Sequence, residues 1–91
     1  MTDTLTDEAI IAEILRQTGA SPAGSISPND VAAALAAPLA TDWRRLLGRV
    51  RRVAVTLAQQ GSIEILRKGR PIAPEELRGV IRLRHRPEGT P

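Results

Sequence analysis

Residues 27–61 read SPNDVAAALAAPLATDWRRLLGRVRRVAVTLAQQG, and this stretch predicts two helices joined by a short turn. Ser27 can cap the first helix, and Pro28 suits its first position. Asp30 stands three residues after the cap, where its carboxylate can reach back to the Ser27 N–H. Pro38 disfavours helical geometry in the residue before it, so this helix should be short and end at about residue 36.

The second helix of the pair is the longest that we expect in the chain, from Trp43 to about Gln60. Thr41 or Asp42 can cap its start, and Gly61 suits its end. Its apolar residues recur at helical spacing, and the buried face is expected to hold Leu46, Val50, Val53 and Leu57. Five arginines and no acid occur between Trp43 and Gln60. This helix should therefore have a strongly positive outer face.

Three further elements are expected around this pair. Before it, residues 6–18 predict an amphipathic helix ended by Gly19, and residues 20–25 predict a loop. Ile26 then suits a short extended piece at a sheet edge. After the pair, residues 62–65 and 80–84 alternate with a period of two, which predicts two strands. The connection over 67–79 looks too long for a two-residue hairpin turn, and 74–77 should form one helical turn within it.

This order of elements is that of a winged helix-turn-helix domain, an α+β fold in which a three-helix bundle is followed by a two-stranded antiparallel β-hairpin, the wing. The sequence resembles a family of short bacterial winged-helix domains that remain functionally uncharacterised. The resemblance is carried by residues 27–32, 42–44, 61–65, 68–71 and 79–83. It covers about residues 6–85, which should form one domain between flexible tails at 1–5 and 86–91. The resemblance implies no catalytic residues.

The charges of the chain are unevenly distributed. Residues 1–42 hold one base against six acids, whereas residues 43–91 hold twelve bases against four acids. The net charge of +3 therefore hides a basic second half. Such an asymmetry predicts a polyanionic partner. With Trp43 as the only aromatic residue, single-stranded nucleic acid is disfavoured, since its binding usually relies on stacked bases. Trp43 itself is expected to fill the core at the start of the long helix.

Double-stranded DNA is the partner that we expect. In helix-turn-helix proteins the second helix of the motif lies in the major groove. Arginine can bond guanine edges or grip a phosphate, and a glycine lets the helix axis approach the DNA. The residues expected to contact DNA are Arg44, Arg45, Gly48, Arg49, Arg51 and Arg52 of the long helix and Arg67, Lys68, Arg70 and Arg78 of the wing. Such a protein would act as a transcriptional regulator.

A protein-interaction adaptor is the alternative, because the same basic helix face could dock an acidic protein surface. A homodimer that pairs through the first helix is a further alternative, since this helix has a wide apolar stripe of Ile10, Ile11, Ile14 and Leu15. The arginines could also be simply solvated, or could pair with the acids of residues 1–42. A DNA-binding protein should present its bases on one surface free of acids. An adaptor should interrupt that surface with an apolar or acidic cluster.

Other functional classes find little support in the sequence. The chain has no cysteine and a single histidine, His85, which is too few ligands for a zinc site. It contains no phosphate-binding glycine loop. We therefore expect no catalytic activity, metal, cofactor or small-molecule ligand. No apolar run approaches the roughly 20 residues that cross a bilayer, and acids stand where a signal peptide needs bases. The expectation is a cytoplasmic protein without a membrane partner.

Overall fold

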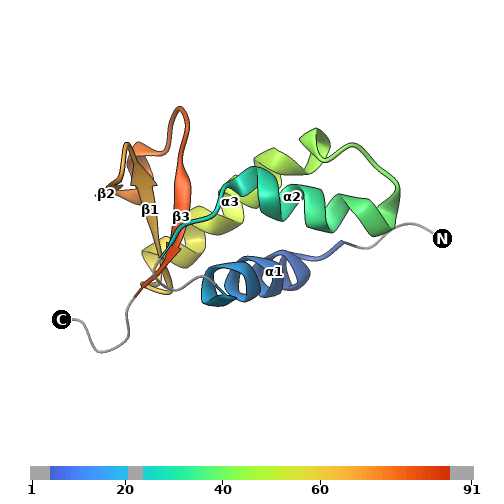
Figure 1. Cartoon of the computed structure of the whole chain (residues 1–91), viewed down its shortest axis with the longest axis horizontal. Helices are drawn as coiled ribbons and strands as arrows, with labels where there is room; N and C mark the ends of the chain where they lie inside the picture. The colour runs from blue at the N-terminus through green and yellow to red at the C-terminus, as the bar shows by residue number, and fades with distance from the viewer. Residues whose placement is uncertain (1–4, 21–23, 87–91) are drawn as a thin grey trace.

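The computed structural model describes residues 5–20 and 24–86, which form three helices followed by a three-stranded antiparallel sheet (Figure 1). The helices are α1 (Asp7–Ala20), α2 (Pro28–Ala36) and α3 (Arg44–Gln59), and the strands are β1 (Ile63–Arg67), β2 (Arg70–Ile72) and β3 (Arg82–His85). Two short 3₁₀ helices, η1 (Ala37–Leu39) and η2 (Pro74–Glu76), lie in the connections. The predicted α+β class is confirmed, and the arrangement is consistent with a winged-helix fold.

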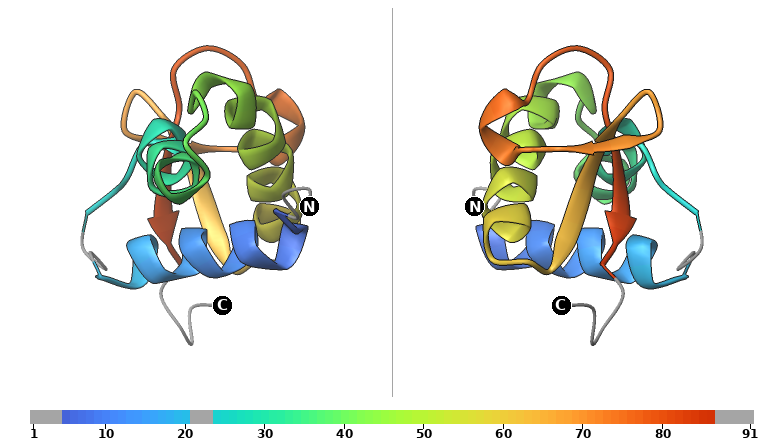
Figure 2. Two further views of the ribbon diagram at one scale, coloured as in Figure 1. Left: turned by 90° about the vertical axis from the view of Figure 1, so that its right-hand side faces the viewer. Right: turned by 90° about the vertical axis from the view of Figure 1, so that its left-hand side faces the viewer.

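The apolar core joins all three helices to the inner face of the sheet. Its largest fully buried apolar side chains are those of Ile10, Ile14, Val31, Val50, Ile63, Ile65 and Leu83. Figure 2 shows α1 lying across one end of α3 and of the strands, and both α3 and β3 contact it. Leu5 packs against this core from within the predicted tail 1–5. The rest of that tail, residues 87–91 and loop residues 21–23 lie outside the described residues.

The predicted capping signals of α2 are confirmed in detail. The Ser27 hydroxyl accepts a hydrogen bond from the Asn29 N–H at 3.0 Å, and the Asp30 carboxylate accepts one from the Ser27 N–H at 3.0 Å. The helix ends at Ala36, as the proline two residues later predicts. At the start of α3, the Asp42 carboxylate accepts a hydrogen bond from the Arg44 N–H at 3.0 Å.

The end of α1 differs from the prediction by two residues. The helix continues through Gly19 to Ala20. Gly19 does not adopt the positive φ that is typical of a glycine at the end of a helix. Thr18, which is buried, satisfies its hydroxyl by donating to the Ile14 carbonyl at 2.9 Å. A buried hydroxyl bonded back to its own helix is compatible with one more half-turn of helix.

The strand order is β2-β1-β3, and this corrects the expected two-stranded hairpin. β1 turns directly into β2 through Lys68 and Gly69, whose φ angles are 55° and 80°. Positive φ at both central residues is what a type I′ hairpin turn requires. Residues 73–81, called the return segment below, then lead to β3 and contain the predicted helical turn as η2. Ile26 pairs with Leu83 through hydrogen bonds of 2.8 and 2.7 Å, which confirms the predicted sheet edge.

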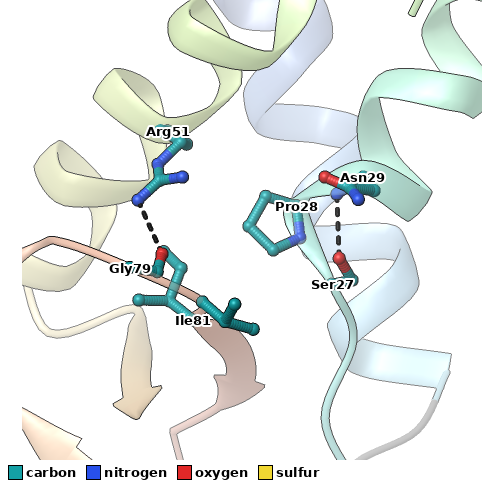
Figure 3. A pocket seen from close by; sticks show the side chains of 7 residues that line it. Ser27, Pro28, Asn29, Arg51, Gly79 and Ile81 are labelled. Carbon is teal, nitrogen blue, oxygen red and sulfur yellow. Dashed lines mark hydrogen bonds between the residues drawn. The ribbon is translucent and has the colours of Figure 1, made fainter. Parts of the chain in front are cut away.

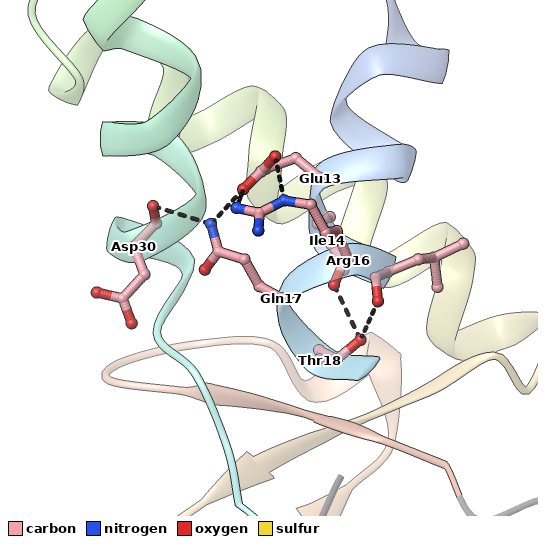
Figure 4. A network of polar contacts seen from close by, with 7 residues as sticks. Glu13, Ile14, Arg16, Gln17, Thr18 and Asp30 are labelled. Carbon is pink, nitrogen blue, oxygen red and sulfur yellow. Dashed lines mark hydrogen bonds and ion pairs between the residues drawn. The ribbon is translucent and has the colours of Figure 1, made fainter. Parts of the chain in front are cut away.

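A polar network on α1 ties this helix to α2 (Figure 4). The Glu13 carboxylate accepts hydrogen bonds from the Arg16 guanidinium at 3.1 Å and from the Gln17 amide at 2.7 Å. The same amide donates to the Asp30 carbonyl at 3.3 Å. The Arg16 guanidinium holds the pKa of Glu13 below its ordinary value of 4.5, against the opposing effect of partial burial.

This lowered pKa predicts a pH-dependent contribution to stability. Because the carboxylate is stabilised in the folded state, its contribution is present above pH 4.5 and is lost as the pH falls through the lower, folded pKa. Glu13→Gln should therefore lose less stability on acidification than the wild type. Urea unfolding at a series of pH values from 7 downward measures the difference. Glu8→Gln, on the exposed first turn of α1, is the matched control. If the wild type and Glu13→Gln lose the same stability on acidification, the prediction is wrong.

Candidate nucleic-acid interface

The outward face of α3 is basic and open. Val50, Val53, Ala54 and Leu57 turn into the core, while Arg44, Arg45, Gly48 and Arg52 are exposed. A Cβ built on Gly48 would have no neighbouring atom within 4 Å, so the helix surface between these arginines is free of obstruction. The helix contains no acidic residue. An unobstructed positive surface of this kind can approach a polyanion closely.

Arg44 is held in place at the start of this face. Its guanidinium lies 4.9 Å from the centre of the Trp43 ring, in a cation–π arrangement, and 3.3 Å from the Asp42 carboxylate. Trp43 is half-buried and packs against the core, as its predicted role requires. The side chain of Arg44 nevertheless stays 71% exposed. It can therefore meet a ligand from a fixed position.

Arg45 and Arg52 are the two arginines of α3 that remain uncommitted. Both are exposed, and within the described part of the chain neither side chain has a hydrogen-bond or ion-pair partner. Their charges therefore stay available to an incoming anion.

Arg49 and Arg51, in contrast, are half-buried and held by other elements of the domain. The Arg49 guanidinium contacts the Asp7 carboxylate of α1 at 3.0 Å. The Arg51 guanidinium donates to the Gly79 carbonyl in the return segment at 3.1 Å (Figure 3). Two positions along an α-helix turn the side chain by about 200°, so these two arginines lie at opposite margins of the outward face. Arg49 and Arg51 were both predicted to contact DNA, but these bonds hold their guanidinium groups at the edges of the outward face of α3.

Arg51 also takes part in the small cavity drawn in Figure 3. This cavity, of about 210 Å³, is lined by Ser27, Pro28, Asn29, Arg51, Gly79, Val80 and Ile81. It brings the start of α2, the middle of α3 and the return segment together. The Arg51 bond to Gly79 therefore fixes the return segment against the helical part of the domain.

The predicted wing residues fall into two groups. Arg67, Lys68 and Arg70 gather at the β1–β2 hairpin, where Arg67 and Arg70 are opposite each other in the register. Arg78 lies in the return segment, next to Gly79. Among the residues that the structure describes, these four bases have no hydrogen-bond or ion-pair partner through their side chains. Figure 2 shows the hairpin, the return segment and the start of α3 on the side of the domain opposite α1.

Two features near this end were not expected from the sequence. η2 packs against α3, and it carries the exposed carboxylates of Glu75 and Glu76. The basic surface is thus free of acids along α3 itself but is bordered by acids at η2. Val80 is 87% exposed. The alternating segment 80–84 predicts a strand from Val80 onward, but β3 begins at Arg82, so Val80 belongs to the return segment.

The match to a known family covers nearly the whole domain. A family model for proteins of unknown function, DUF3253, matches residues 5–86, which include every helix and strand described above. The chain belongs to the DUF3253 family. This agrees with the expected membership of an uncharacterised family. No curated protein matches this DUF3253 chain. Within residues 5–20 and 24–86, no helix is long and apolar enough to cross a bilayer, and no three His, Asp or Glu side chains cluster as metal ligands would.

Proposed function

We propose that this DUF3253 chain is a cytoplasmic protein that binds double-stranded DNA, and that it serves as a transcriptional regulator. α3 would lie in the major groove, and the β1–β2 hairpin would contact the backbone or an adjoining minor groove. The observation that carries the proposal is the outward face of α3, where Arg45 and Arg52 stand exposed and unpaired beside Gly48.

The geometry supports this proposal in three ways. The missing side chain of Gly48 allows the helix axis to approach base edges, and the planar guanidinium of arginine suits both guanine and phosphate. Lys68 and its neighbours in the hairpin supply a second cluster of unpaired bases, and the hairpin and the start of α3 both lie on the side of the domain away from α1. Phosphate contacts from such a cluster would fix the orientation of the protein on the duplex.

The salt dependence of duplex binding tests the proposal. A labelled duplex of random sequence is titrated with the protein at several salt concentrations, and fluorescence polarisation gives the dissociation constant. If about five of the unpaired bases neutralise phosphates, the logarithm of the affinity should fall against the logarithm of salt with a slope of about −4 to −5. Absence of binding at low salt, or a slope near zero, would contradict the proposal.

A further inference from the structure

Leu66 is an apolar side chain buried outside the core. Its neighbour Ile65 faces the core, and successive side chains of a strand point to opposite faces, so Leu66 points to the outer face of the sheet. In the register it lies between Pro71 of β2 and Arg82 of β3. Only 6% of Leu66 is exposed. The outer face therefore has an apolar spot of its own, next to the β1–β2 hairpin.

A groove of about 320 Å³ opens over this spot. It is lined by Ser25, Leu66, Lys68, Gly69, Val80 and Arg82. Isolated exposed apolar residues are common on protein surfaces. Val80 is different because it borders a hollow whose floor is also apolar. The groove can thus receive an apolar side chain between Leu66 and Val80, whereas the charged duplex backbone would gain little there.

The charged residues around the groove are basic. Lys68 has no ion-pair or hydrogen-bond partner in the described part of the chain. The Arg82 guanidinium donates to the hydroxyl and the carbonyl of Ser25 at 2.7 and 2.8 Å, and this leaves three of its five N–H groups open. No acid lines the groove. The complementary charge is negative, and an acidic peptide supplies it as carboxylates beside an apolar side chain that fits the groove.

We propose that this groove binds an acidic peptide segment of a partner protein. One aliphatic or aromatic side chain of the peptide packs between Leu66 and Val80, and its flanking carboxylates meet Lys68 and Arg82. The proposal concerns a protein-interaction site on the outer face of the sheet. It does not depend on DNA binding by α3.

Selection from a random peptide library displayed on phage tests the proposal, with the full chain as bait and the Val80→Ser variant for counter-selection. The expected result is a consensus with acids around one aliphatic or aromatic residue. Loss of the burial of a valine side chain should weaken binding of a selected peptide about tenfold in Val80→Ser. Lys68→Gln should weaken it further, and the effect should fade with added salt. Leu15→Ser, at an exposed apolar residue of α1, is the matched control and should bind like the wild type.

Four outcomes would overturn the proposal. The first is a selection without an acidic and apolar consensus, and the second is peptide binding that Val80→Ser leaves unchanged. The third is a loss of duplex affinity in Val80→Ser with no peptide selected, which would assign the surface to DNA. The fourth is a dimer in sedimentation that Val80→Ser dissociates, which would assign the groove to a second copy. Failure of duplex binding alone would contradict the DNA contacts proposed for α3 and the hairpin and would leave the proposed peptide site unaffected.

Discussion

The double variant Arg45→Ala/Arg52→Ala should bind duplex DNA about 30-fold more weakly than the wild type, if each arginine contributes roughly 1 kcal/mol. Both side chains are exposed and unpaired within the described residues, so their removal should leave the fold intact. If they contact phosphates, the salt slope should become less steep by about 2. If they read base edges, the affinity for one preferred sequence should fall more than that for random duplex.

A matched variant, Arg16→Ala/Arg86→Ala, separates local contact from net charge. It also removes two positive charges, but from exposed positions on α1 and after β3. Affinity loss in the Arg45 and Arg52 variant alone would support a contact at α3. Equal losses in the two variants would show that only total charge matters, and the assignment of α3 to the major groove would then be wrong.

Leu83→Ala should lower the free energy of unfolding by about 2–5 kcal/mol, the usual cost of truncating a buried leucine. Leu83 is fully buried in β3, where it pairs with Ile65 of β1 and with Ile26. Its loss would leave a cavity where the sheet meets the helices. A domain of this size has a stability of only about 5–14 kcal/mol, so the loss should be evident in urea unfolding followed by circular dichroism.

Val80→Ala is the control for this prediction, because it shortens an apolar side chain three residues earlier that is 87% exposed. Its effect should stay within about 0.5 kcal/mol, as for most surface substitutions. Comparable losses in the two variants would contradict the placement of Leu83 in the core and of Val80 in solvent.

The parts of the fold that the sequence predicted correctly depend on local signals. Ser27, Pro28 and Asp30 define the start of α2 through contacts made within one helical turn. The period of the apolar residues likewise identifies α3. The β1–β2 turn was missed because Lys68 is not a residue that usually adopts a positive φ, whereas the glycine after it is. Gly69, four residues after the alternating run 62–65, was the available signal.

The candidate interface could be predicted only in part, because the partners of its arginines come from distant segments. The sequence places five arginines on α3. It does not reveal that Arg49 forms an ion pair with Asp7 or that Arg51 donates a hydrogen bond to the Gly79 carbonyl. These contacts join residues 42 and 28 positions apart. They depend on how α1 and the return segment pack against α3, which no local pattern encodes.

The contact between Trp43 and Arg44 gives the domain a built-in optical reporter. Since Trp43 is the single aromatic residue of the chain, all of its near-ultraviolet emission arises at the first turn of α3. A ligand that draws the Arg44 guanidinium off the indole would change the quantum yield, while a ligand in the groove over Leu66 would leave it unaltered. The emission of the unlabelled protein would thus report on occupancy at the start of α3 alone.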